Sequence, residues 1–261
     1  MSKQKLDMSG KKWIKNSISI WSDIRKNKKE RELGHPALFP VMLVERLLDC
    51  FSHKGEFVFD PFAGTGSTLI GARNRDRRSI GLELSQKYIN IFKERNAATL
   101  YPNHLYNPKI INDDSRNMLN YINKNVIDLT ITSPPYWNIL NQKRTADRKG
   151  SKNYSSKSKD LGNILSYEDF LEEIKGVFKK VYSCTKDDGY CCIIVMDIRK
   201  KNKFYPLHID TVLIMEDINF ELDDIIIWDR RHEYNNLRPL GYPYVFRVNK
   251  THEFILIFKK H

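Results

Sequence analysis

Cysteine is scarce in this chain and follows no pattern typical of a disulfide framework or a zinc site. The four cysteines, Cys50, Cys184, Cys191 and Cys192, include no CxxC pair. Three of them lie in apolar stretches that we expect to form helix or strand, so we interpret them as buried thiols. The seven histidines are scattered. Because isolated histidines are more often structural than ligands, we expect no metal site.

Long hydrophobic runs are also missing. No stretch reaches the roughly 18 apolar residues of a membrane span, and no charged and apolar leader opens the chain. We therefore expect a cytoplasmic protein without a membrane partner. The chain has 261 residues and 41% hydrophobic content, which suits one large α/β domain or one domain with a small appendage.

Basic residues exceed acidic ones, with 44 Lys and Arg against 32 Asp and Glu and a formal charge of +12. Such a charge favours an acidic partner, and nucleic acid is the leading candidate, although an ordinary basic protein would have the same composition. The segment 1–34 concentrates this charge around Trp13 and Trp21. We interpret it as a basic N-terminal arm that either contacts nucleic acid or docks on the remaining domain, 35–261, through its tryptophans.

From residue 38 onward, helical and strand patterns alternate along the chain. Apolar spacing predicts helices at 38–51, 68–75, 86–98, 167–184 and 206–217, and strands at 57–59, 79–83, 110–112, 126–132, 191–196, 224–228 and 253–258. This alternation predicts βαβ units and a doubly wound α/β fold with a mostly parallel, seven-stranded sheet. The last two strands read as a hairpin, so the last strand should be antiparallel.

Two stretches without periodicity, 138–165 and 230–250, are rich in basic residues. Structureless loops of this length are uncommon within compact domains unless they are functional or disordered. We interpret both as candidate nucleic-acid-contacting loops. Their candidate contact residues are Lys143, Arg144, Arg148, Lys149, Arg230, Arg231 and Arg238.

A glycine-bearing turn, Asp60-Pro-Phe-Ala-Gly-Thr-Gly-Ser67, follows the first predicted strand. Gly64 and Gly66 lack the Cβ that would keep a ligand from the backbone. Asp60 is placed to pair with a cationic amino group, and Glu83, after the next strand, to accept bonds from ribose hydroxyls. The turn alone also matches dinucleotide loops or a plain tight turn, but the missing third glycine favours S-adenosylmethionine over NAD.

A second acidic site follows the third predicted strand at Asp113-Asp114. One of these carboxylates can accept a proton of the adenine amino group of the same cofactor. Either aspartate can instead be a helix N-cap, and the residues alone do not separate the two interpretations.

The strand 126–132 runs directly into Ser133-Pro-Pro-Tyr136. Two consecutive prolines end the strand in a rigid turn at the sheet edge where open α/β folds bind ligands. The lone pair of an exocyclic amine is delocalised into its base, so fixed acceptors such as the Ser133 hydroxyl and the Pro134 carbonyl would have to orient it. Tyr136 would stack on an extruded base. Alone, the motif can also be a strand exit that only shapes a turn.

Together these motifs resemble the DNA amino-methyltransferases that modify the N4 of cytosine or the N6 of adenine, over most of residues 35–261. The resemblance implies a Rossmann-like catalytic methyltransferase domain there and S-adenosyl-L-methionine as cofactor. It implies the cofactor-binding residues Phe39, Pro40, Asp60, Phe62, Ala63, Gly64, Thr65, Gly66, Ser67, Thr68, Glu83 and Asp114, and the catalytic residues Ser133, Pro134, Pro135 and Tyr136.

Two departures from this family stand out. In family members with this style of motif the tetrapeptide often precedes the glycine loop, whereas here the glycine loop comes first, so the order is permuted. Outside the catalytic motifs, no segment of this chain is large enough to form a separate target-recognition region. Serine at the first tetrapeptide position is typical of the N4-cytosine enzymes.

The sequence thus favours a site-specific DNA methyltransferase acting on cytosine N4. An N6-adenine enzyme and an RNA base amino-methyltransferase remain open alternatives. A binding module with a degenerate site would show a lost glycine or a broken tetrapeptide, and neither is seen. DNA is the expected partner, a cognate restriction endonuclease is a further candidate, and the chain is either a monomer or a homodimer.

Overall fold

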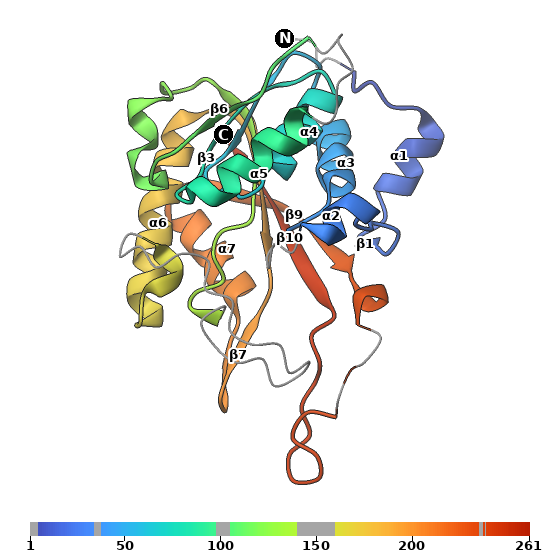
Figure 1. The fold of residues 1–261 in the computed structure, drawn as a ribbon, viewed down its shortest axis with the longest axis vertical. Coiled ribbons are helices and arrows are strands. Elements are labelled where there is room, and N and C mark those ends of the chain that lie inside the picture. Colours follow the sequence, from blue (N-terminus) through green and yellow to red (C-terminus); the bar gives the residue numbers. More distant parts are fainter. Residues whose placement is uncertain (1–4, 34–37, 98–104, 140–159, 235–236, 238) are drawn as a thin grey trace.

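A computed structural model describes residues 5–33, 38–97, 105–139, 160–234, 237 and 239–261. Its core is an eight-stranded sheet in the order β1-β9-β10-β6-β5-β2-β3-β4 (Figure 1). The strands are β1 (Ile20–Trp21), β2 (Phe57–Asp60), β3 (Arg78–Leu82), β4 (Lys109–Ile111), β5 (Ile127–Thr132), β6 (Thr185–Val195), β9 (Phe220–Asp229) and β10 (His252–Lys260). β10 is antiparallel to both neighbours, and the other pairings are parallel.

Helices cover both faces of the sheet. The helices α3 (Val41–Phe51), α4 (Ser67–Asn74) and α5 (Gln86–Ala97) lie on one side, and α6 (Tyr167–Cys184) and α7 (Leu207–Asp217) lie on the other (Figure 1). Successive residues of a strand point to opposite faces. In β6, Cys191 and Ile193 therefore join the cluster with α6 and α7, whereas Cys192 and Ile194 join the cluster with α3. This alternation confirms the predicted doubly wound fold.

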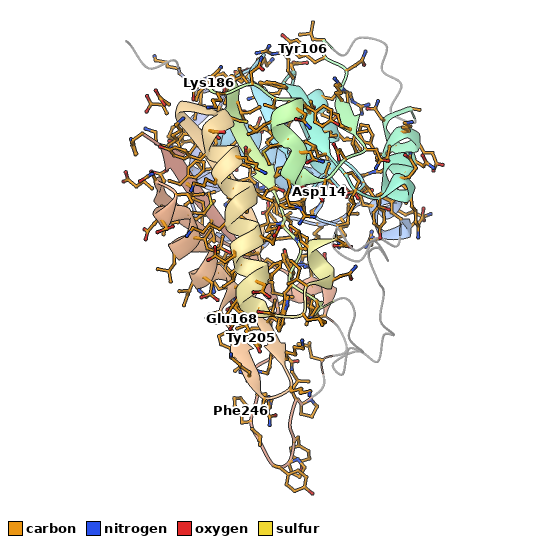
Figure 2. The ribbon with its side chains drawn as sticks, turned by 90° about the vertical axis from the view of Figure 1, so that its left-hand side faces the viewer. Tyr106, Asp114, Glu168, Lys186, Tyr205 and Phe246 are labelled. Carbon is orange, nitrogen blue, oxygen red and sulfur yellow. The ribbon has the colours of Figure 1, made fainter. Side chains whose placement is uncertain are left out.

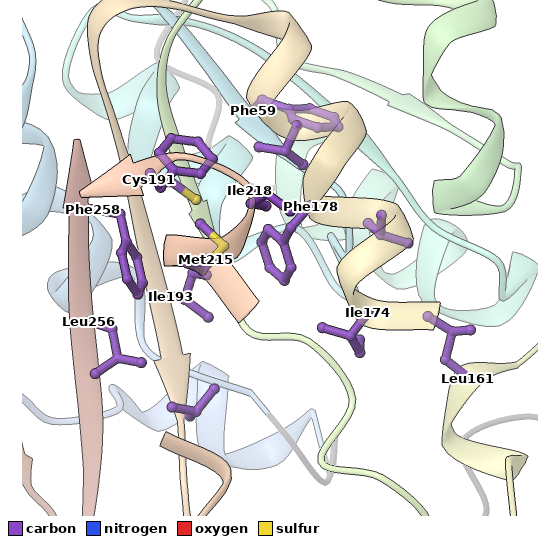
Figure 3. Close-up of a cluster of buried hydrophobic side chains, with 14 of the residues drawn as sticks. Phe59, Leu161, Ile174, Phe178, Cys191, Ile193, Met215, Ile218, Leu256 and Phe258 are labelled. Carbon is purple, nitrogen blue, oxygen red and sulfur yellow. The ribbon is translucent and has the colours of Figure 1, made fainter. Parts of the chain in front are cut away.

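Helix α6 shows how local sequence and packing agree. The Ser166 side chain accepts the Asp169 backbone N–H at 3.1 Å and caps the first turn. The apolar stripe of the helix, including Ile174 and Phe178, packs into the core against Ile193 of β6 (Figure 3). The buried cysteines that the sequence predicted, Cys184, Cys191 and Cys192, lie in or beside this core, and Cys50 is half-buried.

The sheet has one strand more than the seven predicted. The extra strand, β1, comes from the segment predicted as an arm and pairs in parallel with β9. It escapes a search for alternating polarity because it has only two residues. Trp21 is 1% exposed and the buried Ile24 lies near it, whereas Trp13 is 53% exposed, so this segment docks on the domain through its second tryptophan.

Several smaller elements complete the fold. The N-terminal segment also forms α1 (Gly10–Asn16) and α2 (Lys28–Glu32), and an unpredicted hairpin of β7 (Ile198–Lys200) and β8 (Lys203–Tyr205) follows β6. Short 3₁₀ helices are η1 (Ser115–Asn120), η3 (Leu161–Asn163) and η4 (Arg231–Glu233). Within the part of the chain that the structure describes, no helix is long and apolar enough to cross a membrane.

Candidate active site

The predicted motifs meet at the edge of the sheet where the parallel strands end. Asp60 ends β2, Glu83 follows β3 and Ser133 follows β5. Since neighbouring parallel strands end at the same edge, these side chains come together although they are far apart in sequence. Thr132, the last residue of β5, donates its hydroxyl to Asp60 Oδ1 at 2.6 Å, so the glycine loop and the Ser-Pro-Pro-Tyr loop start from one hydrogen-bonded pair.

The glycine loop is a tight turn that needs its glycines. Gly64 and Gly66 have φ of +52° and +79°, in the left-handed region that favours glycine. A Cβ on Gly66 would lie 2.1 Å from the ring of Phe92 in α5. Gly66 precedes α4 without a side-chain cap, so the loop presents the amino terminus of this helix at the sheet edge.

Asp60 is fully buried and only partly satisfied. Its Oδ1 accepts bonds from Thr132 and from the backbone N–H of Phe62, at 3.0 Å for the latter, while its Oδ2 has no hydrogen-bond partner in the described structure. Burial raises the pKa of this carboxyl to about 6. An unpaired buried oxygen of this kind fits a cationic donor, which would both satisfy it and favour its charged form.

Glu83 is fixed beside the same loop. It is 4% exposed. Its Oε2 accepts the backbone N–H of Gly64 at 2.8 Å, and its Oε1 accepts that of Ser85 at 2.7 Å. A carboxylate has about four lone-pair sites, and carboxylate oxygens at this position are the type of acceptor that the hydroxyls of a ribose require. These contacts suit the role that the sequence predicted for Glu83.

Asp114 adopts the N-cap conformation that the sequence left open. It caps η1 by accepting the backbone N–H of Arg116 at 2.9 Å, and the Arg116 guanidinium bonds to both of its oxygens. Although burial opposes ionisation, the bonds and charge of Arg116 lower the pKa of Asp114.

A second buried acid near this site is Asp160. Its Oδ2 has no hydrogen-bond partner among the described residues. Burial raises the pKa of Tyr88, and the negative charges of Glu83 and Asp160 raise it further. No sequence motif indicated Asp160.

The Ser-Pro-Pro-Tyr loop is tied to β10. The Ser133 hydroxyl donates to Tyr136 Oη at 3.0 Å, and this phenol donates to Oε2 of Glu253, also at 3.0 Å. Burial, followed by the charge of Glu253, raises the pKa of Tyr136, so the phenol remains a donor. Because the Ser133 proton is used inside the loop, its oxygen lone pairs remain for an incoming N–H. Arg230 forms an ion pair with Glu253 from the opposite side.

Glu253 is a residue that the sequence analysis missed in this role. It is 5% exposed, directly before the apolar run Phe254–Phe258 of β10. Acids are almost never fully buried unless they are paired, so its place within a predicted core strand was an available signal. Its partners could not be identified from the sequence, because Tyr136 lies 117 positions away.

Arg95 of α5 braces the glycine loop, again without a sequence prediction. It donates to the carbonyl and the hydroxyl of Thr65 at 2.7 and 3.0 Å and lies 3.6 Å from Glu30 of α2. Glu30 also accepts the backbone N–H of Val41 at the start of α3, at 2.8 Å. The N-terminal segment is thereby connected to the glycine loop.

The remaining predicted residues lie around these contacts or outside the described residues. Pro134 is buried, and Pro135 is half-buried. Phe39, Pro40, Ala63, Ser67 and Thr68 are buried, and Phe62 is half-buried. Arg231 is 77% exposed and paired with Asp229, whereas the Arg230 side chain is only 14% exposed. Lys143, Arg144, Arg148, Lys149 and Arg238 lie outside the described residues. Across the described ranges, no group of three or more His, Cys, Asp and Glu side chains is arranged to hold a metal.

The sheet order and site define the class of Rossmann-like methyltransferase folds, and solved structures agree. A SAM-dependent methyltransferase from Methanosarcina mazei matches with a TM-score of 0.53 at 10% identity, covering 82% of this chain and 96% of that one. TrmN from Thermus thermophilus also matches with a TM-score of 0.53, at 12% identity, over 88% of this chain and 52% of its own. At these identities the likeness concerns the fold.

The family follows from the sequence match. The family model for N6/N4 DNA methylases matches residues 1–94 and 127–261, so the chain belongs to this DNA methylase family. This confirms the resemblance inferred from the motifs, and S-adenosyl-L-methionine is the cofactor of the family.

Curated relatives share a shorter region. The type II methyltransferase M.BglI of Bacillus subtilis is 35% identical over 89 residues, which is 34% of this chain and 24% of that protein. The orphan methyltransferase M.BamHII of Bacillus amyloliquefaciens is 44% identical over 61 residues, 23% of each chain. The matches thus span about a quarter of these relatives' length.

Proposed function

We propose that this protein is a site-specific DNA methyltransferase that transfers a methyl group from S-adenosylmethionine to the exocyclic N4 of cytosine. The observation that carries the proposal is the orientation of Ser133. Its hydroxyl donates within the loop to Tyr136 at 3.0 Å, and its strand is bonded through Thr132 to Asp60 of the glycine loop. An acceptor for an amino group is thus held beside the proposed cofactor site.

In this proposal the chain's own groups orient both reactants. Asp60 binds the amino group of the cofactor, Glu83 binds its ribose, and the glycine turn permits close approach of its methionine part. When bound, the cofactor supplies an electrophilic methyl sulfonium. Ser133 Oγ and the Pro134 carbonyl each accept one N–H of the target amine, which directs the nitrogen lone pair out of the ring plane. Tyr136 stacks on the extruded base.

Nucleic-acid contacts are assigned to the basic segments. In this proposal the basic residues of the segments 138–165 and 230–250 bind phosphates, with Arg231 as the exposed cation among the described candidates. A cognate restriction endonuclease, cytoplasmic location and the choice between monomer and homodimer stay predictions from the sequence.

The proposal is tested by identifying the methylated nucleoside. The protein is incubated with isotopically labelled S-adenosylmethionine and either duplex DNA or RNA, and the digested nucleosides are analysed by mass spectrometry. Labelled N4-methyldeoxycytidine is the expected product. Labelled N6-methyldeoxyadenosine would replace the cytosine assignment by the adenine alternative, and label only in RNA would reject DNA as the substrate.

Replacing Glu253 by glutamine should slow methyl transfer about tenfold without changing cofactor affinity. The charged partner of the Tyr136 hydroxyl is lost, and hydrogen bonds to charged groups contribute about 1.5–3 kcal/mol. Single-turnover rates and calorimetric Kd values test this, with thermal melting as a check because Arg230 also loses a partner. The matched control is Glu221→Gln. Glu221 is an exposed acid near the start of β9, far from the site, and it pairs with His261. An equal loss of cofactor affinity would reject a positioning role.

Cofactor affinity should fall as the pH drops below about 6, the raised pKa of Asp60. The cofactor's α-amino group stays cationic in this range, because its pKa is about 7.7–8.0. A cation favours the ionised carboxylate, so protonation of Asp60 competes with binding and weakens it about tenfold at pH 5. Calorimetric titrations across this range test the trend. Asp60→Asn should bind weakly with a flat pH profile, and an unchanged wild-type affinity at pH 5 would remove Asp60 from the site.

A further inference from the structure

A turn with exposed aromatic side chains projects beyond the sheet. We call residues 241–248 the aromatic finger. Tyr242, Tyr244 and Phe246 are 79%, 91% and 92% exposed, and Val248 is 61% exposed. Figure 2 shows Phe246 on this projection, at the opposite end of the molecule from Tyr106. Contiguous exposed apolar side chains rimmed by polar groups mark interaction sites.

The finger has a defined turn and a support. The backbone N–H groups of Tyr244 and Val245 both donate to the Gly241 carbonyl, at 2.9 and 2.8 Å. Gly241 has φ of +80°, and a Cβ there would lie 2.0 Å from the Val245 carbonyl oxygen. Arg247 donates to the Lys201 carbonyl at 3.0 Å and to Asn202 Oδ1 at 2.8 Å. The hairpin of β7 and β8 therefore holds the base of the finger.

The surroundings of the finger are basic. The hairpin segment 198–205 and the segment 239–250 contain no Asp or Glu. Their cations are Arg199, Lys200, Lys201, Lys203, Arg247 and Lys250. Lys250 lies 4.8 Å and Arg199 5.3 Å from the Phe204 ring in cation–π geometry. Exposed aromatic rings within acid-free basic flanks are complementary to bases and phosphates together, which is the chemistry of nucleic-acid binding.

The finger and its hairpin are coupled to the reacting loop. Lys200 lies 3.9 Å above the ring of Trp137, the residue after Tyr136, and donates to Asn138 Oδ1 at 3.2 Å. Tyr205 of β8 contacts the same Trp137 ring, with centroids 5.0 Å apart. The hairpin follows β6, which ends at the same sheet edge as β5. The finger thus projects from the edge at which a base would enter.

We propose that the aromatic finger inserts Tyr244 and Phe246 between stacked bases of duplex DNA beside the target base, while the flanking cations bind phosphates. This inference rests on the proposed function for its substrate. A wedge of this kind would help to separate the target base from its neighbours, and it would place part of the missing target-recognition function within residues 241–248.

The double variant Tyr244→Ala/Phe246→Ala tests the wedge. Its affinity for pooled genomic duplex fragments, measured by fluorescence anisotropy with S-adenosylhomocysteine present, should fall by about 10- to 100-fold, the loss expected when aromatic stacking on bases is removed. The slope of log Kd against log salt should not change, because no charge is removed. A duplex with an unpaired bubble should restore much of the affinity, since its bases are already unstacked.

Two single variants serve as controls. Lys201→Gln should reduce the salt slope by about one, and Leu105→Ala, at a 72% exposed apolar residue away from the finger, should bind as the wild type. A double variant that binds duplex DNA with wild-type affinity would overturn the wedge. So would a loss of affinity for RNA alone, or a variant in which only the oligomeric state changes, as measured by light scattering. If the wild-type protein methylates no DNA, the proposed function itself is wrong. If the wild type methylates DNA and the double variant binds duplex DNA as tightly as the wild type, only the role of the aromatic finger is wrong.

Discussion

Replacing Ser133 by alanine should reduce the single-turnover rate of methyl transfer by about 10²- to 10³-fold, the cost typical of removing one preorganised hydrogen-bonding group at a reacting centre. The Kd for S-adenosylmethionine should stay nearly unchanged. Ser133 contacts Tyr136 at 3.0 Å rather than the glycine loop, so its loss removes an acceptor for the amine and leaves the cofactor contacts in place. Quench-flow rates with labelled cofactor and calorimetric titrations measure the two quantities.

The control for this variant is another serine-to-alanine change. Ser183 on α6 donates to the Lys180 carbonyl at 2.8 Å, away from the sheet edge, and Ser183→Ala should transfer methyl groups at the wild-type rate. Loss of cofactor binding with an unchanged transfer rate in Ser133→Ala would overturn the assigned role.

Replacing Gly66 by valine should lower the affinity for S-adenosylmethionine by more than about 100-fold. The new Cβ would lie 2.1 Å from the Phe92 ring, and φ of +79° disfavours a β-branched residue. The turn must therefore move, and with it the backbone that follows Asp60. Strain of this kind costs on the order of 1–3 kcal/mol, so circular dichroism should accompany the calorimetric titration to show that the variant is folded.

Gly176→Ala is the matched control for this change. Gly176 lies within α6, and apart from its chain neighbours and the backbone of its own helix no described atom lies within 4 Å of an added Cβ, so this variant should bind the cofactor normally. An unchanged Kd in a folded Gly66→Val protein would remove the loop from the cofactor site.

The elements that the sequence predicted are those with long periodic patterns. The helix α6 was predictable because its apolar residues recur on one face. The strand β5 was predictable because Ile127, Leu129 and Ile131 alternate with polar residues up to Thr132, directly before the Ser-Pro-Pro-Tyr loop. The joining of Asp60 and Glu83 was also predictable, since each motif follows a parallel strand and such strands end at one edge. The structure confirms these elements.

The missed features depend on short elements and distant partners. The hairpin of β7 and β8 has strands of only three residues each, and half of these residues are Lys or Arg, so the strands show little alternation of polarity. Both oxygens of Asp114 bond to Arg116, a contact that the motif alone does not specify. The bond between Tyr136 and Glu253 joins the Ser-Pro-Pro-Tyr loop to β10, and only the folded sheet brings these residues together.

The most direct test of the central claim is a crystal structure with bound S-adenosylhomocysteine. We expect the amino group of the ligand on Asp60, its ribose hydroxyls on Glu83, and its sulfur between the glycine loop and Ser133. A ligand bound elsewhere, or bound without contact to Asp60 and Glu83, would contradict the assigned cofactor site.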